Sequence, residues 1–126
     1  MPNNRLITKE KIAAYASVLL DAANTSGGQD AVLEVREQAE KIVSVMRTNV
    51  DLSGALEDAA YTPEQRAQIA RAAFAQCNPA FTEVLAVMAE RGEIKLFPQV
   101  RASYENQVET KLNLCILDVT TVVELD

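Results

Sequence analysis

Few residues of this chain combine a reactive side chain with a spacing that could support catalysis. The sequence has no histidine, which excludes Ser-His-Asp and Cys-His nucleophiles and most zinc sites. Cys77 and Cys115 lie far apart and match no metal or redox motif, so we expect both to be small core residues. Glu37 and Glu40 lie among basic residues on the polar face of a predicted helix and are ordinary solvated charges. We therefore expect a protein that is not an enzyme and that holds no metal or cofactor.

The composition narrows the classes of partner. The chain has 126 residues, 48% of them apolar, which is enough for one domain with a buried core. Its net charge of -6 argues against nucleic acid and anionic lipid as partners, because phosphate binding needs clustered Lys and Arg. No apolar run approaches the ~20 residues of a membrane span, and residues 1–5 lack the pattern of a secretory signal. We expect a cytoplasmic protein with no direct membrane insertion.

Residues 78–98 are the most informative segment. Asn78 can cap a helix by accepting from first-turn amides, Pro79 suits the first helical position, and Gly92 can end the helix in the left-handed conformation. The apolar side chains cover an arc of roughly 200°, against a stripe of about 100° on an ordinary surface helix. This arc consists of Phe81, Leu85, Met88 and Ala89 on one side and of Val84 and Val87 on the flank. The surplus predicts a second contact, either within the domain or with a partner.

Six amphipathic segments with short connections predict an all-α, six-helix bundle over residues 1–112. Helices are expected from Thr8 to just before Thr25, from Asp30 to about Thr48, from Asp51 to about Ala60, from Thr62 to Cys77, from Asn78 to Gly92, and from Ile94 or Pro98 to Leu112. Residues 114–123 are instead rich in β-branched side chains and predict a short strand. A single strand has no partner for its ladder hydrogen bonds. We therefore expect residues 113–126 to be the start of a truncated C-terminal α/β domain.

The first predicted helix has the same surplus of apolar surface. Its core stripe leaves a second row, formed by Tyr15, Val18 and Ala22, along one side of the helix. Together with the flank of the helix that begins at Asn78, this row could frame a groove for a third amphipathic helix. Alternatively, the second or sixth predicted helix covers both rows, since aromatic residues such as Tyr15 usually fill cores.

Three segments of the chain resemble motifs of one known family. Residues 15–23 are similar to the opening Y-A-x-A-L-[FL]-x-x-A of the ATP synthase delta subunit, the bacterial relative of mitochondrial oligomycin-sensitivity-conferring protein. Residues 84–100 resemble its FLxLLAENxRLxxLPxI segment, and residues 119–125 resemble the V-T-S-A-x-P-L that opens its C-terminal domain. All three occur in the order and spacing of the family. The chain departs from the family pattern at Glu93, where a basic residue is usual, and at Thr121, Val122 and Glu124.

The resemblance implies the role of a stator connector. In this family the N-terminal domain is a six-helix bundle whose helices 1 and 5 hold the N-terminal helix of an alpha subunit, and the C-terminal domain meets the b subunits of the peripheral stalk. The complex lies on the cytoplasmic face of the membrane and couples proton transport to ATP synthesis. Carried over by position, the residues that would bind the alpha-subunit helix are Tyr15, Val18, Ala22, Val84, Val87 and Met88, of which Met88 also points towards the core.

Two other classes of protein stay open. The alternative reading is a cytoplasmic, all-helical regulatory adaptor that binds another amphipathic helix through the same surface. A third is an RNA-binding helical bundle of the antitermination type, which the acidic balance disfavours. Mixing the protein with an alpha-subunit N-terminal peptide and with RNA distinguishes the three.

Overall fold

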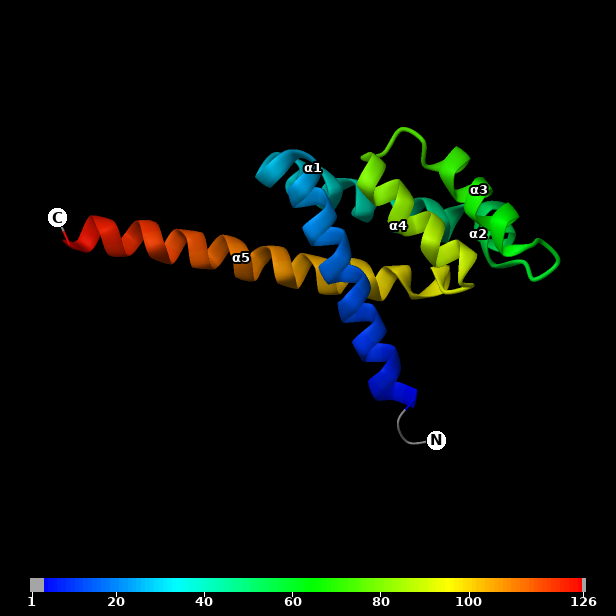
Figure 1. The fold of residues 1–126 in the computed structure, drawn as a ribbon, viewed down its shortest axis with the longest axis horizontal. Helices are drawn as coiled ribbons and strands as arrows, with labels where there is room; N and C mark the ends of the chain where they lie inside the picture. Colours follow the sequence, from blue (N-terminus) through cyan, green and yellow to red (C-terminus); the bar gives the residue numbers. More distant parts are fainter. Residues whose placement is uncertain (1–3, 126) are drawn as a thin grey trace.

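The computed structural model describes the backbone of residues 4–125 and the side chains of residues 7–111. The secondary structure of this part of the chain is entirely helical (Figure 1). Its elements are α1 (Asn4–Thr48), α2 (Val50–Glu57), α3 (Pro63–Ala73), α4 (Pro79–Glu90), the 3₁₀ turn η1 (Ile94–Leu96) and α5 (Phe97–Leu125). The predicted all-α class is therefore confirmed.

The structure has five α-helices where six were predicted, because α1 spans the first two predicted helices. The backbone departs from helical dihedral angles at Gly27 (φ -163°, ψ 20°) and at Gly28 (φ 67°, ψ -152°). The region that Gly28 occupies is essentially restricted to glycine. The two halves of α1, residues 4–26 and 29–48, therefore change direction at this point, as Figure 1 shows.

The strand predicted for residues 114–123 is wrong, because α5 continues through this range to Leu125. An isolated strand leaves its backbone N–H and C=O groups without ladder partners, and residues 4–125 contain no strand that could pair with it. A helix satisfies the same groups within the segment itself, which outweighs the weak helix propensity of β-branched residues. In Figure 1 the last part of α5 extends away from the other helices.

The core joins elements that are far apart in the sequence. α5 packs along α1, α3 packs against α4, and α4 also contacts α1. Phe81 of α4 and Phe97 of α5 are fully buried, with ring centroids 5.7 Å apart. Tyr104 of α5 donates a hydrogen bond to the carbonyl of Val32 in α1 at 2.7 Å, and burial raises the pKa of Tyr104 to about 12. Within the described residues, no helix is long and apolar enough to cross a lipid bilayer.

Candidate functional site

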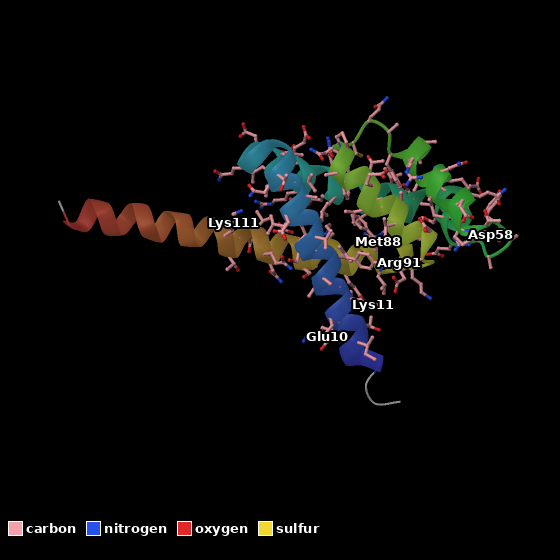
Figure 2. The ribbon with its side chains drawn as sticks, in the orientation of Figure 1. Glu10, Lys11, Asp58, Met88, Arg91 and Lys111 are labelled. Atoms are coloured by element: carbon pink, nitrogen blue, oxygen red, sulfur yellow. The ribbon has the colours of Figure 1, made fainter. Side chains whose placement is uncertain are left out.

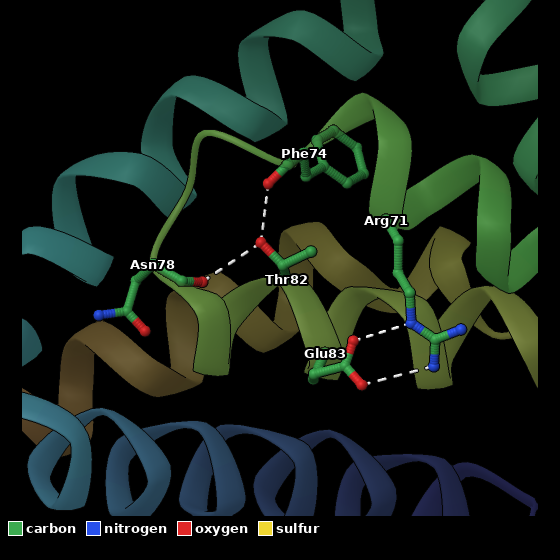
Figure 3. Close-up of polar contacts among 5 residues, drawn as sticks. All are labelled: Arg71, Phe74, Asn78, Thr82 and Glu83. Atoms are coloured by element: carbon green, nitrogen blue, oxygen red, sulfur yellow. Dashed lines mark hydrogen bonds and ion pairs between the residues drawn. The ribbon is translucent and has the colours of Figure 1, made fainter.

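The first turn of α4 is held by residues of other segments. The side-chain oxygen of Asn78 accepts a hydrogen bond from the Ala80 amide at 2.9 Å, which confirms the predicted N-cap. The Asn78 amide donates to Gln38 Oε1 of α1 at 2.8 Å. The Thr82 hydroxyl donates to the carbonyl of Phe74 at 2.7 Å (Figure 3). These contacts fix the start of α4 against α1 and α3.

The last turn of α4 ends at a left-handed glycine, as predicted. Gly92 has φ 70°, its amide donates to the Ala89 carbonyl at 3.1 Å, and the Glu93 amide donates to the Met88 carbonyl at 2.8 Å. This pair of hydrogen bonds defines a Schellman motif, which closes the helix and satisfies two of its last carbonyl groups. The motif sets the position of Glu93 immediately after the helix.

Arg66 of α3 supplies a second cap for the same turn. Its guanidinium donates to the Ala89 carbonyl at 2.8 Å, to the Glu90 carbonyl at 3.0 Å and to the Tyr61 carbonyl at 2.8 Å. The last carbonyls of a helix have no intrahelical partner, so a cation with several donors stabilises them. This role of Arg66 could not be predicted from the sequence, because nothing in the helical pattern links Arg66 to a turn so far along the chain.

Tyr15, Lys11 and Glu93 form a polar cluster between α1 and the end of α4. The Tyr15 hydroxyl donates a short hydrogen bond to Glu93 Oε1, and Lys11 Nζ lies 2.7 Å from Glu93 Oε2. The hydrogen bonds from Lys11 and Tyr15 lower the pKa of Glu93. Burial, followed by the hydrogen bond to Glu93, raises the pKa of Tyr15. At neutral pH the carboxylate is therefore charged and the phenol keeps its proton, so both hydrogen bonds form.

A groove of about 470 Å³ lies between the first half of α1 and α4. The two helices run antiparallel there, because Tyr15 contacts Glu93 at the end of α4 while Ser26 lies 3.5 Å from the side-chain amide of Asn78 at its start. The groove is lined by Lys11, Ala14, Tyr15, Val18 and Ala22 from α1 and by Ala80, Glu83, Val84, Val87 and Arg91 from α4 and its C-cap. Its middle is apolar, and its charged side chains lie towards the two ends.

Most of the predicted binding residues line this one groove, namely Tyr15, Val18, Ala22, Val84 and Val87. Val18 is 57% exposed and Val87 is 37% exposed, whereas Tyr15 and Val84 are buried at its floor. Each row is therefore covered in part: Tyr15 and Val84 pack into the core, as the alternative expects, whereas Val18 and Val87 stay exposed.

Met88 is the predicted residue that does not line the groove. Met88, labelled in Figure 2, is 0% exposed and belongs to the core, on the stripe that also contains Phe81 and Leu85. Residues three, four and seven positions apart share a helix face, and Met88 lies three positions after Leu85 and seven after Phe81. Its assignment to the binding surface is therefore corrected.

The charged residues of the groove were not among the binding residues predicted from the sequence. Lys11 and Arg91 line one end, and Glu83 lies towards the other. Glu83 forms an ion pair with Arg71 of α3 at 2.8 Å (Figure 3). Lys11 precedes Tyr15 by four residues and Arg91 follows Val87 by four, so the helical period alone could have added both to the two rows.

The reactive side chains considered in the sequence, Cys77, Glu37 and Glu40, do not line the groove. Among the described residues, no cluster of three or more His, Cys, Asp and Glu side chains could hold a metal ion. Cys77 packs at the edge of the core, and burial raises the pKa of its thiol, so the thiol stays protonated at neutral pH. The side chain of Cys115 lies outside the described residues. Glu37 and Glu40 are both exposed.

The sequence matches the model of one protein family, and the matched range includes every residue that lines the groove except Lys11. The family model described as ATP synthase delta (OSCP) subunit matches residues 12–126, which is nearly the whole chain. No solved structure matches it.

Proposed function

Because the chain belongs to the ATP synthase delta (OSCP) family, we propose that its bundle binds the N-terminal helix of an alpha subunit in the groove between α1 and α4. Members of this family are peripheral-stalk subunits of ATP synthase, and their role is structural. The proposal goes beyond family membership because it names the binding surface and the partner. Its mechanism is binding, because a helix held in the groove ties the catalytic head to the stalk and resists rotation of the head with the rotor.

The observation that carries the proposal is the pair of exposed apolar residues on opposite walls of the groove. Val18 of α1 and Val87 of α4 remain in contact with water although each neighbours a fully packed core. An amphipathic helix that lies in such a groove removes both side chains from water. From Lys11 to Ala22 the groove follows α1 for roughly 16 Å, so a docked helix would contact it over about three turns.

The walls of the groove are held in place without a partner. Asn78 and Arg66 fix the two ends of α4, and the hydrogen bond to Glu93 fixes the ring of Tyr15 at the floor. A surface that is already ordered loses little conformational entropy when a partner binds. A large part of the apolar contact energy can therefore contribute to affinity.

Titration with a synthetic peptide tests the proposal. The peptide has the N-terminal sequence of the alpha subunit from the same organism, and a scrambled peptide of equal composition is the control. We expect calorimetry to show binding with a negative heat-capacity change, because apolar surface leaves water. We expect amide NMR shifts to cluster at residues 11–22 and 80–91. Absence of binding, or shifts confined to α2 and α3, would overturn the proposal, and equal binding of the scrambled peptide would favour the adaptor reading.

A second part of the proposal concerns the b subunits. We propose that residues 1–112 form the alpha-binding bundle and that residues 113–126 belong to the region through which the protein reaches the b subunits. The support is the resemblance of residues 119–125 to the family motif and the extension of the family match to residue 126. In the assembled ATP synthase on the cytoplasmic face of the membrane, a photo-crosslinker at Thr121 should label a b subunit more than an alpha subunit. The opposite preference would contradict this assignment.

A further inference from the structure

The groove has two unlike ends, and the difference between them restricts what can lie in it. One end is formed by Lys11 of α1 and Arg91 at the C-cap of α4, and the other by Ala22 and Ala80. The antiparallel contacts described above determine which residues share an end. A partner helix can therefore lie in this groove in two directions that are not equivalent.

Towards the Ala80 end, the acidic charge already has a partner. Glu83 Oε2 lies 2.8 Å from Nε of Arg71, and Glu83 Oε1 accepts a longer hydrogen bond from the same guanidinium at 3.4 Å (Figure 3). Contacts to both carboxylate oxygens give the pair a defined geometry. This part of the groove therefore presents a neutral pair of charges to a partner.

At the other end one positive charge remains. Lys11 is paired with Glu93, whose second oxygen accepts from Tyr15. Arg91 is exposed, and no carboxylate among residues 7–111 forms an ion pair with it. The positive charge of Arg91 acts on Tyr15 and Glu93. It opposes the rise in the pKa of Tyr15 and contributes to the lowered pKa of Glu93. Arg91 and Lys11 both line the groove, and Figure 2 shows them close to each other.

The dipole of α4 adds a second asymmetry. Its C-terminal end, next to Arg91, carries a partial negative charge, and its N-terminal end, next to Ala80, carries a partial positive charge. The start of α1 lies about 10 Å beyond Lys11, so its dipole acts on the groove less strongly. A docked helix that runs antiparallel to α4 therefore aligns favourably with the nearer dipole. Helices also favour acidic residues in their first turn.

We propose that the groove selects an amphipathic helix with an acidic side chain in its first turn, which pairs with Arg91 and directs the helix antiparallel to α4. The inference rests on the proposed function and deepens it, because Val18 and Val87 supply affinity and Arg91 supplies direction. In the reverse direction the acidic side chain would lie at the Ala80 end, where no basic residue lines the groove and Glu83 is already paired with Arg71. Arg91 is thus the residue that determines which way the alpha-subunit helix lies.

Charge reversal at Arg91 tests the inference with the alpha-subunit N-terminal peptide. At low salt we expect Arg91→Glu to weaken binding about three- to tenfold, and high salt should reduce the difference, because the pair is at the rim of the groove. A peptide whose first-turn acidic residue is replaced by lysine should bind Arg91→Glu better than it binds the parent protein. Lys111→Glu makes the same change in net charge on α5, outside the groove, and should leave the affinity unchanged.

The direction of the helix has its own measurement. A nitroxide at the N-terminus of the peptide should broaden the amide signals near Lys11 and Glu93 and spare those near Ala22 and Ala80. Broadening at the Ala22 end, or equal affinity of Arg91→Glu and the parent at low salt, would overturn the inference. The proposed function has a separate test, because Val87→Asp must still weaken peptide binding strongly even if Arg91 proves irrelevant. If the peptide binds neither protein nor variant, the proposed function itself fails.

Discussion

Leu85 and Val87 lie two residues apart on α4 and face opposite environments. Leu85 is 0% exposed in the core, whereas Val87 is 37% exposed in the groove. Two positions along a helix rotate a side chain by about 200°, so the helix separates the residues that stabilise the fold from those that can meet a partner. This relationship allows folding and binding to be tested independently on one element.

An aspartate at each position should give different defects. Val87→Asp should weaken binding of the alpha-subunit peptide by about 2 kcal/mol or more, because docking would desolvate the new charge. Its melting temperature should stay close to that of the parent, whereas Leu85→Asp should unfold the protein, because it buries an unpaired charge. Titration calorimetry and thermal melts followed by circular dichroism measure the two effects.

Val50 provides the matched control for Val87. It is 75% exposed on α2 and does not line the groove, so Val50→Asp should change neither melting nor binding. Equal damage to the fold by Val87→Asp and Leu85→Asp would place Val87 in the core. Normal folding of Val87→Asp with full peptide affinity would place the binding site elsewhere.

Removal of the Arg66 guanidinium should destabilise the end of α4. Arg66→Ala removes the side-chain donor of the Glu90 carbonyl and leaves the Ala89 carbonyl with the Gly92 amide alone, and hydrogen bonds from charged groups are worth about 1.5–3 kcal/mol. Arg66→Lys should recover only part of this loss, because an ammonium cannot reproduce the fork of the guanidinium. Urea denaturation measures the effect, with Arg47→Ala as an exposed control. Equal stability of Arg66→Ala and Arg47→Ala would show that the cap contributes nothing.

Gly28 and Gly54 should respond in opposite ways to alanine. Gly28→Ala should destabilise the protein by about 1–3 kcal/mol, because its dihedral angles are strained for any side chain. Gly54 lies inside α2 with open space around it, so Gly54→Ala should stabilise by about 0.5–1 kcal/mol. Urea titration of the two variants gives the comparison. Stabilisation by Gly28→Ala would contradict the kink in α1.

Glu93 should make stability depend on pH in the acidic range. Its lowered pKa means that the folded protein binds a proton less readily than the unfolded chain. The stabilisation is therefore complete above the ordinary glutamate pKa of about 4.3 and is lost as the pH falls through the lower folded value. Glu93→Gln should be less stable at pH 7 by up to about 1 kcal/mol, a modest effect because Lys11 is half-exposed.

The difference between Glu93→Gln and the parent should shrink as the pH falls through the lowered folded-state pKa of Glu93, and it should vanish once the carboxyl is protonated in the folded protein as well. Urea denaturation at several pH values measures it, and Glu109→Gln on α5 is an exposed control. A difference that persists unchanged at acid pH would mean that the ion pair with Lys11 and the hydrogen bond from Tyr15 are not its source.

Local signals in the sequence predicted the parts of the fold that depend on neighbouring residues. The caps at Asn78 and Thr62 and the stop at Gly92 follow from capping chemistry, and the structure places them as predicted. The two apolar rows follow from helical spacing, and the structure brings all of their residues except Met88 to one groove. The capping role of Arg66 and the pairing of Glu93 with Tyr15 could not be predicted, because both depend on tertiary contacts between distant segments.

The errors at residues 114–123 and at Met88 have separate causes. β-branched composition favours a strand only where a neighbouring strand exists to pair with it. Met88 lies at the border of two helix faces in the sequence pattern, and the packing around Phe81 and Leu85 assigns it to the core.

The groove takes one wall from α1 and the other from α4, which α2 and α3 separate along the chain. Only the folded bundle brings these walls together, so a partner that occupies the groove binds the native state and not the unfolded chain. Such a partner raises the free energy of unfolding by about 2.7 kcal/mol when it is present at 100 times its dissociation constant. Subunits assembled into the complex would consequently resist the proteases that degrade unassembled subunits. The groove would thus help to match the amount of this subunit to the amount of its partner.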